Sequence, residues 1–322
     1  MTKELLLLRH GKSDWATDTD DFHRPLKNRG KRGAQKIGLW MLQNQQVPDF
    51  VISSPAVRAI TTTEKACKVM GFKARSIMRD ERVYMAPPEE LIDVIRSCPA
   101  EVRRLMVVGH NPGMEQLLVL LADQQVDIPK DGKLLPTSTL AILSVNGAWK
   151  NLSANQSRLL NVVRARGLSD KFPFPDLDST ELRERPAYYY YQSAVIPYRL
   201  ANGKPEVLVI NSSSGKRRVF PKGIIDPALT PYESAAKEAF EEAGVKGVVD
   251  EEILGEYYSD KWGAKCHVLV YPMEVTEIIP EKIWKEKHRS RKWIKIEDAS
   301  QHIENADLLL IVDMLSKKLR KG

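Results

Sequence analysis

Residues 5–11 read LLLLRHG, and this short stretch decides the fold class. Its four consecutive leucines suit a strand that is buried on both faces, as strands of parallel sheets are. Two further apolar runs, Phe50–Ile52 and Leu105–Val108, have the same character. Alternation of such strands with helices is typical of an α/β fold, which we predict for the first half of the chain. The helical stretches between the runs lie at 33–42, 56–70 and 88–97.

Each of these predicted strands leads into polar residues. Arg9 and His10 follow the first strand, Arg58 lies shortly after the second, and His110 follows the third. Because ligands of open α/β sheets bind at the carboxyl ends of the strands, we expect these side chains to share one pocket. Guanidinium groups suit phosphate oxygens, and imidazole can act as a nucleophile. A lone histidine at a strand end is ordinarily a hydrogen-bonded polar residue, whereas this set favours phosphate chemistry.

The motifs around these residues resemble the histidine phosphatase superfamily. LLLLRHGKSDW at 5–15 is similar to its RHG motif, ISSPAVRAITTTEKA at 52–66 to its arginine-bearing segment, and VVGHNPG at 107–113 to its second-histidine motif. HRPLKNRG at 23–30 and VYMAPPEELIDVI at 83–95 resemble the short SixA-like branch. The resemblance covers roughly residues 3–167 and implies an α/β/α histidine phosphatase fold.

The same resemblance assigns roles to the polar residues. It implies that His10 is the nucleophile that becomes phosphorylated, that Arg9 and Arg58 bind the phosphoryl oxygens, and that His110 completes the pocket. It implies no metal or other cofactor at this site. Larger members supply an acidic residue that protonates the leaving group, and no carboxylate here matches that motif. The acidic residues nearby are Glu81, Glu89 and Glu90. A site without this acid favours good leaving groups, such as phosphohistidine on a protein.

A second cluster, EAFEEAG at 238–244, gathers three carboxylates on one face of a predicted helix. Glu238, Glu241 and Glu242 stand at i, i+3 and i+4, where like charges repel by roughly 0.2–0.5 kcal/mol per pair. A hard divalent cation, which prefers carboxylate oxygens, would offset that repulsion. The spacing alone is also compatible with a solvated acidic face, in which Lys237 pairs with Glu233 or Glu241. We expect the helix to begin after Thr230 and to end at Gly244.

The residues around this helix, PKGIIDPALTPYESAAKEAFEEAGV at 221–245, resemble the Nudix box. The resemblance covers about 187–322 and implies an α/β/α sandwich around a mixed sheet that hydrolyses phosphoanhydrides. It implies that Mg²⁺ or Mn²⁺ is held by Glu238, Glu241, Glu242 and the carbonyl group of Gly223, and that a residue such as Glu238 orients the attacking water. Two positions depart from the box: Leu229 occupies the position of its first glutamate, and Lys237 occupies the position of its arginine.

Two basic runs flank this box. Around them, INSSSGKRRVFPKG at 210–223 and RKWIKIEDA at 291–299 resemble the diphosphoinositol polyphosphate and diadenosine polyphosphate hydrolases. Basic runs are often plain solvated surface, but two of them beside a metal helix favour a cradle for several phosphates. The candidate substrate-binding residues are Lys216, Arg217, Arg218, Lys222, Arg289 and Arg291.

The whole-chain properties agree with two enzyme domains. The 322 residues predict about two domains, which we place at 1–167 and 187–322 with a proline-rich, charged linker at 168–186. The net charge of +7 favours anionic partners, and the three scattered cysteines read as free thiols. We expect a cytoplasmic protein, because no apolar run is long enough for a signal peptide core or a membrane span.

The sequence leaves two functional hypotheses open. The first is a bifunctional phosphohydrolase with phosphorylated small molecules as substrates. The second is a regulatory phosphatase acting on phosphohistidine proteins, with a weakly active Nudix domain that senses a nucleotide. Binding to nucleic acid is disfavoured because no aromatic platform or RNA-binding motif is present. The sequence does not specify an oligomeric state.

Overall fold

The computed structural model describes residues 2–173, 181–227 and 229–321. The chain divides into two compact units, Met1–Phe172 and Pro173–Gly322, which we call the N-terminal and C-terminal units. Part of the predicted linker, residues 174–180, lies outside the described residues. On either side of that part, β7 (Phe172–Pro173) and β8 (Leu182–Arg183) form a two-stranded sheet.

The N-terminal unit is built on one six-stranded sheet with the order β3-β2-β4-β1-β5-β6. The first four of these strands are parallel, while β5 runs antiparallel to β1 and β6 antiparallel to β5. The carboxyl ends of β1, β2 and β4 therefore share one edge of the sheet with the start of β5. The strands are β1 (Thr2–Arg9), β2 (Phe50–Ser53), β3 (Ile77–Arg79), β4 (Arg104–Gly109), β5 (Thr139–Asn146) and β6 (Ser157–Arg164).

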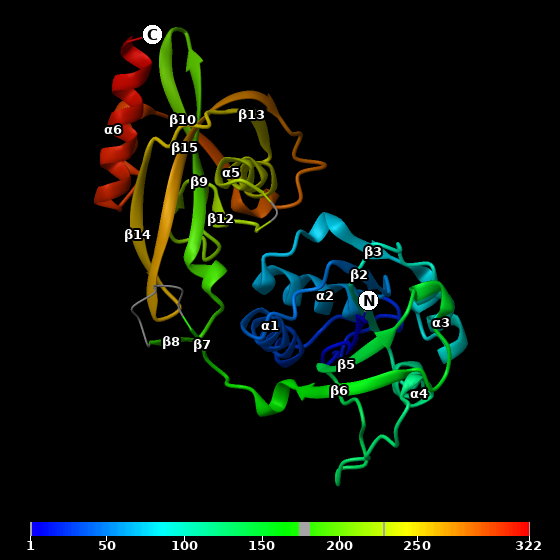
Figure 1. The fold of residues 1–322 in the computed structure, drawn as a ribbon. Helices are drawn as coiled ribbons and strands as arrows, with labels where there is room; N and C mark the ends of the chain where they lie inside the picture. Colours follow the sequence, from blue (N-terminus) through cyan, green and yellow to red (C-terminus); the bar gives the residue numbers. More distant parts are fainter. Residues whose placement is uncertain (1, 174–180, 228, 322) are drawn as a thin grey trace. The chain divides into compact units, whose positions relative to one another are not determined.

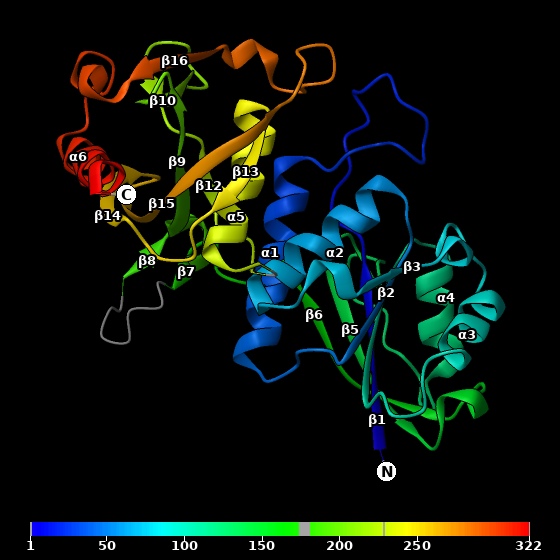
Figure 2. The ribbon, with the colours of Figure 1, turned by 90° about the horizontal axis from the view of Figure 1, so that it is seen from above.

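Helices cover both faces of this sheet (Figure 2). Leu6 and Leu8 pack with residues of α1 and α2, whereas Leu5 and Leu7 pack with residues of α3 and α4. The leucine run of β1 is thus buried on both faces, which explains why it lacks polar alternation. The predicted α/β/α architecture is confirmed. The helices are α1 (Asn28–Gln43), α2 (Val57–Met70), α3 (Pro88–Arg96) and α4 (Gly113–Leu121).

The C-terminal unit contains an eight-stranded mixed sheet. Its central path runs β11-β10-β9-β15-β13, and only the β9–β15 pair is parallel among the pairs described. The strands are β9 (Tyr191–Ala201), β10 (Lys204–Asn211), β11 (Arg218–Val219), β12 (Lys222–Ile224), β13 (Val245–Val249), β14 (Gly255–Lys261), β15 (Ala264–Ile278) and β16 (Arg291–Lys295).

Two helices lie on opposite faces of this second sheet (Figure 1). Helix α5 (Pro231–Glu238) buries Ala235 against one face, and α6 (Ala306–Lys321) buries Leu308, Ile311 and Leu315 against the other. This arrangement is the predicted α/β/α sandwich with a mixed sheet. None of the helices in the described part of the chain is long and apolar enough to cross a membrane.

Several local elements differ from the sequence-based expectations. Residues 187–190 form a short 3-10 helix before β9, which the sequence did not indicate. Helix α4 and strand β6 were not predicted. The glutamate helix continues beyond α5 as a π-helical segment, Ala239–Ala243, and then ends at Gly244, whose φ of 61° lies in the left-handed region. A π-helical turn is uncommon and is frequently found at functional sites.

Candidate active sites

The strand ends of the N-terminal unit bring the predicted phosphate-site residues together. Arg9 is the last residue of β1 and pairs in register with Gly109 of β4, so His10 and His110 follow adjacent parallel strands. Their ring centroids lie 5.0 Å apart. Arg58 lies in the first turn of α2, directly after β2, and its side chain is buried. The structure thus gathers all four residues at one edge of the sheet.

His10 is held in the form that a nucleophile requires. Its Nδ1 lies 2.7 Å from the carbonyl oxygen of Gly11 and, as the N–H tautomer, donates to it, which leaves Nε2 with a free lone pair. Burial lowers the pKa of His10 to about 3, against the Gly11 hydrogen bond, and the charges of Arg58, Arg9 and Arg24 lower it further. The imidazole is therefore neutral near pH 7 and available to attack phosphorus.

His110 shares this desolvated environment. Burial, followed by the neighbouring His10 and Arg58, lowers the pKa of His110 to about 3. Its Nε2 lies 2.8 Å from the Ser54 hydroxyl, and the ring of Tyr84 approaches it edge-on with centroids 5.4 Å apart. These contacts fix the second imidazole as a neutral hydrogen-bonding group beside the first.

Arg24 is a third arginine of this site, and the sequence reasoning did not assign it. Its side chain is buried, its guanidinium stacks on Trp15 at 3.3 Å from the ring centroid, and its charge acts on His10. Within the described residues, Nε of Arg9, Arg24 and Arg58 and Nη1 of Arg24 are buried without a hydrogen-bond partner. Buried donors of this kind are costly unless paired, so they suit the oxygens of a phosphoryl group.

Asp21 organises two of these arginines. Its carboxylate accepts hydrogen bonds from Nη2 of Arg58 at 2.7 Å, from the Tyr84 hydroxyl at 2.8 Å, and from Arg24. Although partial burial acts to raise it, the pKa of Asp21 is lowered by the Tyr84 hydroxyl and by Arg58. Asp21 is thus an ionised acceptor at the site and not a preprotonated acid.

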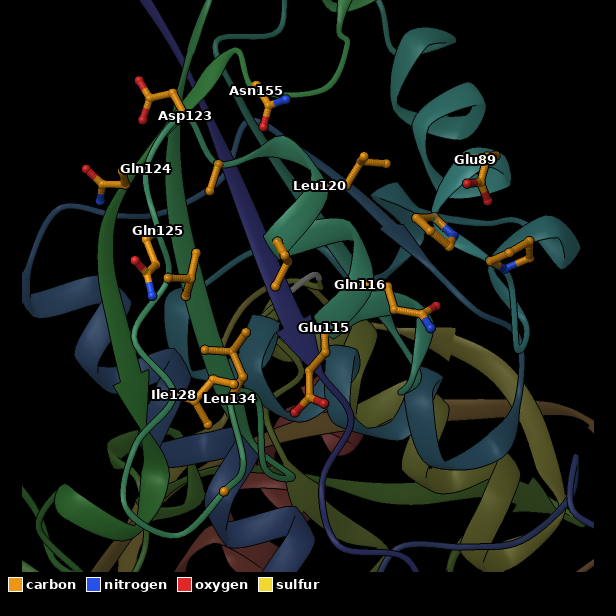
Figure 3. A pocket seen from close by; sticks show the side chains of 16 residues that line it. Glu89, Glu115, Gln116, Leu120, Asp123, Gln124, Gln125, Ile128, Leu134 and Asn155 are labelled. Atoms are coloured by element: carbon orange, nitrogen blue, oxygen red, sulfur yellow. The ribbon is translucent and has the colours of Figure 1, made fainter.

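A large cavity of the N-terminal unit lies elsewhere, beside α4 (Figure 3). It has a volume of about 1070 Å³ and is lined by apolar residues such as Leu120 and Ile128 together with Glu89, Glu115 and Gln116. Neither the two histidines nor the arginines described above line it. Glu89, one of the acids considered from the sequence, therefore belongs to this cavity and not to the histidine site.

In the C-terminal unit, two glutamates of the helix flank strand β12. A Cβ atom added to Gly223 would come within 2.0 Å of Oε1 of Glu238, so the Glu238 carboxylate packs directly on that glycine. Oε2 of Glu242 accepts a hydrogen bond from the backbone N–H of Lys222 at 3.1 Å. Glu241 is exposed and lines a small pocket next to Trp284. The predicted ligands are therefore close in space, with Glu241 at the outer side.

These carboxylates carry poorly compensated negative charge. Burial raises the pKa of Glu238 to about 7, and Glu242 and Glu241 raise it further. Glu286 repels both Glu238 and Glu242, although the sequence reasoning did not include it. Among the described residues, no three His, Cys, Asp or Glu side chains are already arranged as a metal-binding group. The donor set nevertheless fits a hard divalent cation, since oxygen ligands and excess negative charge are what such ions bind.

Arg289 supplies part of the missing positive charge. Its side chain is buried, forms an ion pair with Glu242, and lies 3.3 Å from the carboxylate of Glu286. Its Nε donates to the carbonyl oxygen of Asn211 at 3.2 Å. Arg289, a predicted substrate-binding residue, is therefore in direct contact with Glu242, a predicted metal ligand.

A cavity of about 820 Å³ opens beside this cluster and contains most of the predicted substrate-binding residues. Lys216 is not among its lining residues within the described chain. Tyr257 and Tyr258 also line it, and the sequence reasoning did not select them. The predicted residues that line it are Arg217, Arg218, Lys222 and Arg289, together with the carboxylates of Glu242 and Glu286.

Arg291 requires a correction. Its Nη1 donates to the carbonyl oxygens of Ala243 at 3.1 Å and Gly244 at 2.8 Å, and its Nη2 donates to that of Ile279 at 2.6 Å. Its guanidinium also stacks over Trp284 at 4.7 Å from the ring centroid. These contacts make Arg291 a cap for the end of the glutamate helix, so it is not placed to bind substrate.

Comparisons with known proteins match two different families to two parts of the chain. Residues 190–310 match the model of the NUDIX domain, and residues 5–82 match that of the histidine phosphatase superfamily, branch 1. Nudix hydrolase 12, mitochondrial, of Arabidopsis thaliana is 34% identical over 148 residues, which cover 38% of this chain and 72% of the relative. The chain belongs to the Nudix hydrolases, and a histidine phosphatase domain precedes its Nudix domain. It is therefore a hydrolase that acts on phosphate bonds.

Other relatives match one domain at a time. An uncharacterized protein of Mycobacterium tuberculosis is 32% identical over 157 residues, 48% of this chain and 96% of that protein. The solved structure of the protein histidine phosphatase SixA complexed with tungstate covers 52% of this chain and 99% of its own, at 17% identity and a TM-score of 0.45. A C. elegans Ap4A hydrolase binary complex covers 41% and 98%, at 21% identity and a TM-score of 0.36.

The structure also shows how the Nudix domain accommodates its unusual box. The Nζ of Lys237 lies 3.7 Å from the carboxylate of Asp226, and among the described residues neither Glu233 nor Glu241, the partners that the spacing allowed, forms an ion pair with it. Glu233 instead forms a capping box with Thr230 at the start of α5. Leu229 donates its backbone N–H to the Asp226 carbonyl at 2.9 Å, in a turn that brings Asp226 toward the helix. Asp226 thus supplies the acidic partner that Leu229 lacks.

Proposed function

We propose that the protein is a bifunctional phosphohydrolase with two chemically distinct sites. The supporting observation is the separation of charge between its domains. Arg9, Arg58 and Arg24 surround a neutral His10 in the histidine phosphatase domain, whereas Glu238 and Glu242 gather in the Nudix domain. The first arrangement suits transfer of a phosphoryl group to nitrogen, and the second suits hydrolysis assisted by a divalent cation.

In the histidine phosphatase domain, the proposed reaction has two steps. The lone pair on Nε2 of His10 forms a bond to phosphorus while the bond from phosphorus to the leaving group breaks. Water then attacks the phosphohistidine, which releases inorganic phosphate and restores the neutral imidazole. The three arginines stabilise the charge that spreads over the phosphoryl oxygens in both steps. Phosphohistidine and phosphomonoesters with good leaving groups, such as p-nitrophenyl phosphate, are the candidate substrate classes, because the carboxyl group of Asp21 at this site is ionised and cannot protonate a poor leaving group.

In the Nudix domain, we propose that Glu238, Glu241, Glu242 and the Gly223 carbonyl hold Mg²⁺ or Mn²⁺. A bound divalent cation neutralises phosphate charge and activates water. A carboxylate beside the bound cation, such as Glu238, would orient the attacking water. Arg217, Arg218 and Lys222 bind the phosphate chain across the cavity that they line. These roles fit a polyanion such as a dinucleoside polyphosphate or an inositol pyrophosphate.

A regulatory protein remains the competing hypothesis. Arg289 already pairs with Glu242, and Leu229 has replaced the first glutamate of the box. Both features favour a Nudix domain that binds a nucleotide with little turnover, while the other domain acts on phosphohistidine proteins. The two hypotheses differ in whether the Nudix domain hydrolyses its ligand at a substantial rate.

Chelation and mutation separate the two proposed activities. EDTA should abolish hydrolysis of diadenosine polyphosphate and spare hydrolysis of p-nitrophenyl phosphate, whereas His10→Ala should do the reverse. Glu242→Gln should behave like EDTA. Equal loss of both activities on chelation would contradict the two-site proposal. Absent anhydride hydrolysis in the presence of Mg²⁺, with intact phosphatase activity, would favour the regulatory hypothesis.

A further inference from the structure

A strongly basic pocket lies next to the histidine site and has no role in the reactions described above. Its volume is about 510 Å³, within the range of roughly 300–1,000 Å³ that is usual for small-molecule sites. The carboxylates that line it are Asp131 and Asp170, so the seven basic side chains leave the lining with a net charge of +5. The seven basic residues that line it are Lys12, Arg29, Arg32, Lys36, Lys133, Arg164 and Arg166.

The topology places this pocket on the same edge of the sheet as His10. Thr139 begins β5 and Arg164 ends β6, and these two residues pair in register. The backbone N–H of Ser138, another lining residue, donates to the carbonyl oxygen of His10 at 3.1 Å. His10 itself does not line the pocket. Since β6 lies two strand spacings from β1, the paired arginines at the end of β6 lie roughly 10 Å from the end of β1, a distance that a chain of several phosphates spans.

The pocket already holds a carboxylate where an anion would bind. Asp131 accepts a hydrogen bond from Nη1 of Arg164 at 2.9 Å and another from Nη2 of Arg166 at 2.7 Å. One anionic group that bridges two guanidinium groups is the arrangement that phosphate makes with paired arginines. Nearby, Oγ1 of Thr139 is fully buried and has no partner among the described residues. A phosphate oxygen would satisfy this hydroxyl and replace the Asp131 carboxylate.

We propose that this pocket binds a further phosphate group of the same substrate whose terminal phosphoryl group reacts at His10. The substrate of the histidine phosphatase domain is then an extended small molecule with several phosphates, such as a polyphosphate chain. The inference rests on the proposed phosphatase function and narrows its substrate class. A phosphohistidine protein fits less well, because a concave cavity of this size suits a small polyanion better than a protein surface.

A ladder of inorganic phosphates tests the proposal. Phosphate, pyrophosphate, tripolyphosphate and tetrapolyphosphate are used, in EDTA, as competitive inhibitors of p-nitrophenyl phosphate hydrolysis. This readout reports only on the histidine site, even if the Nudix domain also binds the inhibitors. In the wild-type chain, the inhibition constant should fall at least about tenfold from phosphate to tetrapolyphosphate, because each charged hydrogen bond gained in the pocket adds affinity.

Two pairs of substitutions should remove this length dependence. In Arg164→Gln/Arg166→Gln the bridging guanidinium groups are lost. Lys12→Gln/Arg29→Gln removes two exposed cations that line the pocket, which guards against misfolding of the first variant. The matched control is Lys150→Gln/Arg158→Gln, two exposed residues outside the pocket with the same change of charge. In both pocket variants, inhibition by tetrapolyphosphate should weaken at least about tenfold, while inhibition by phosphate changes less than about twofold.

The outcomes separate this inference from the proposed function. The pocket assignment would be overturned if the inhibition constants of both pocket variants fell with polyphosphate length as in the wild-type chain. It would also be overturned if the control variant lost this dependence equally. The phosphatase proposal would stand in both cases. If the wild-type chain fails to hydrolyse p-nitrophenyl phosphate, the phosphatase proposal fails instead. Equilibrium dialysis then measures binding of tetrapolyphosphate to the pocket, with no need for catalysis. It is done in EDTA and in an Arg217→Gln/Arg218→Gln background, which reduces binding at the Nudix cavity. Binding that is equal in the pocket variants and the control would overturn the inference there too.

Discussion

The carboxylate of Asp21 lies 2.7 Å from Nη2 of Arg58, and this pair joins a loop residue to the predicted phosphate-binding arginine. The Tyr84 hydroxyl and Arg24 contact the same carboxylate, so one acidic group orients three partners at the edge of the histidine site. The relationship gives Asp21 a positioning role. Its negative charge also balances part of the arginine charge before substrate arrives.

Replacement of Asp21 should show whether its hydrogen bonds or its charge matter. Asp21→Ala should lower kcat/KM for p-nitrophenyl phosphate by about tenfold or more, because Arg58 loses its orienting acceptor. Asp21→Asn keeps an acceptor oxygen and should restore most of the rate. If the asparagine variant is as impaired as the alanine variant, the charge of Asp21 and not its acceptor geometry is needed. Steady-state kinetics of the three proteins decide between these outcomes.

The buried histidines should make the histidine phosphatase domain sensitive to acid. His10 and His110 have pKa values of about 3 in the folded chain, below the ordinary value of 6.5. Below pH 6.5 the unfolded chain therefore binds protons that the folded chain does not, so folding stability falls as the pH falls toward 3. Each histidine should lose about 2 kcal/mol of stabilisation between pH 7 and 5.

Calorimetric unfolding at pH 7 and pH 5 measures this effect. Replacing His10 and His110 by glutamine should flatten the acid-dependent loss in the domain. The control is His23→Gln, since His23 lies on an exposed loop and pairs with Asp20 at 2.8 Å. Equal pH dependence in the double variant and the wild-type chain would contradict the lowered pKa values.

Gly223→Ala should impair the Nudix site while leaving the fold intact. The new Cβ would meet the Glu238 carboxylate, which is the end of a flexible side chain and can move away. We expect Nudix turnover to fall at least about tenfold, with a change in unfolding free energy of less than about 1 kcal/mol. In a Glu238→Gln background the added methyl group should have little further effect. Unchanged turnover in the single variant would show that the position of Glu238 is unimportant.

Arg291→Gln should behave as a stability variant and not as a substrate-binding variant. Loss of its hydrogen bonds to the carbonyl oxygens of Ala243, Gly244 and Ile279 should cost about 2–3 kcal/mol of unfolding free energy in the Nudix domain. The KM for a polyphosphate substrate should change little. Arg217→Gln/Arg218→Gln should give the opposite pattern, with a raised KM and normal stability. A raised KM in Arg291→Gln without loss of stability would restore its role in substrate binding.

The sequence was informative where a motif coincides with a regular element. The apolar runs before His10 and His110 form adjacent parallel strands, and the Thr230 cap and Gly244 stop delimit the glutamate helix as expected. Strand β6 escaped prediction because SRLLNVVR lacks both a continuous apolar run and a clear alternation. A continuous apolar composition predicts a buried strand, whereas a half-exposed edge strand has no such signature.

Side-chain partners were harder to predict than elements. Arg291 reads as one charge in a basic run, yet its guanidinium turns inward to backbone carbonyls. Asp21 and Arg58 are separated by 37 positions in the chain, and only the tertiary fold brings them together. Asp226 replaces the lost acid of the Nudix box through a turn that no spacing rule encodes. Long-range geometry decides each of these pairings, whereas local pattern decides helices and strands.

The π-helical segment Ala239–Ala243 limits which deletions this helix can tolerate. Its hydrogen bonds span five residues instead of four, so the segment accommodates more chain per turn than an α-helix does. Deleting one residue there would restore α-helical winding, which takes up the change in length, but it would change the angles at which Glu241 and Glu242 project relative to Glu238. The carboxylates would then no longer converge beside Gly223. A grafted or shortened version of this motif must therefore preserve its length as strictly as its glutamates.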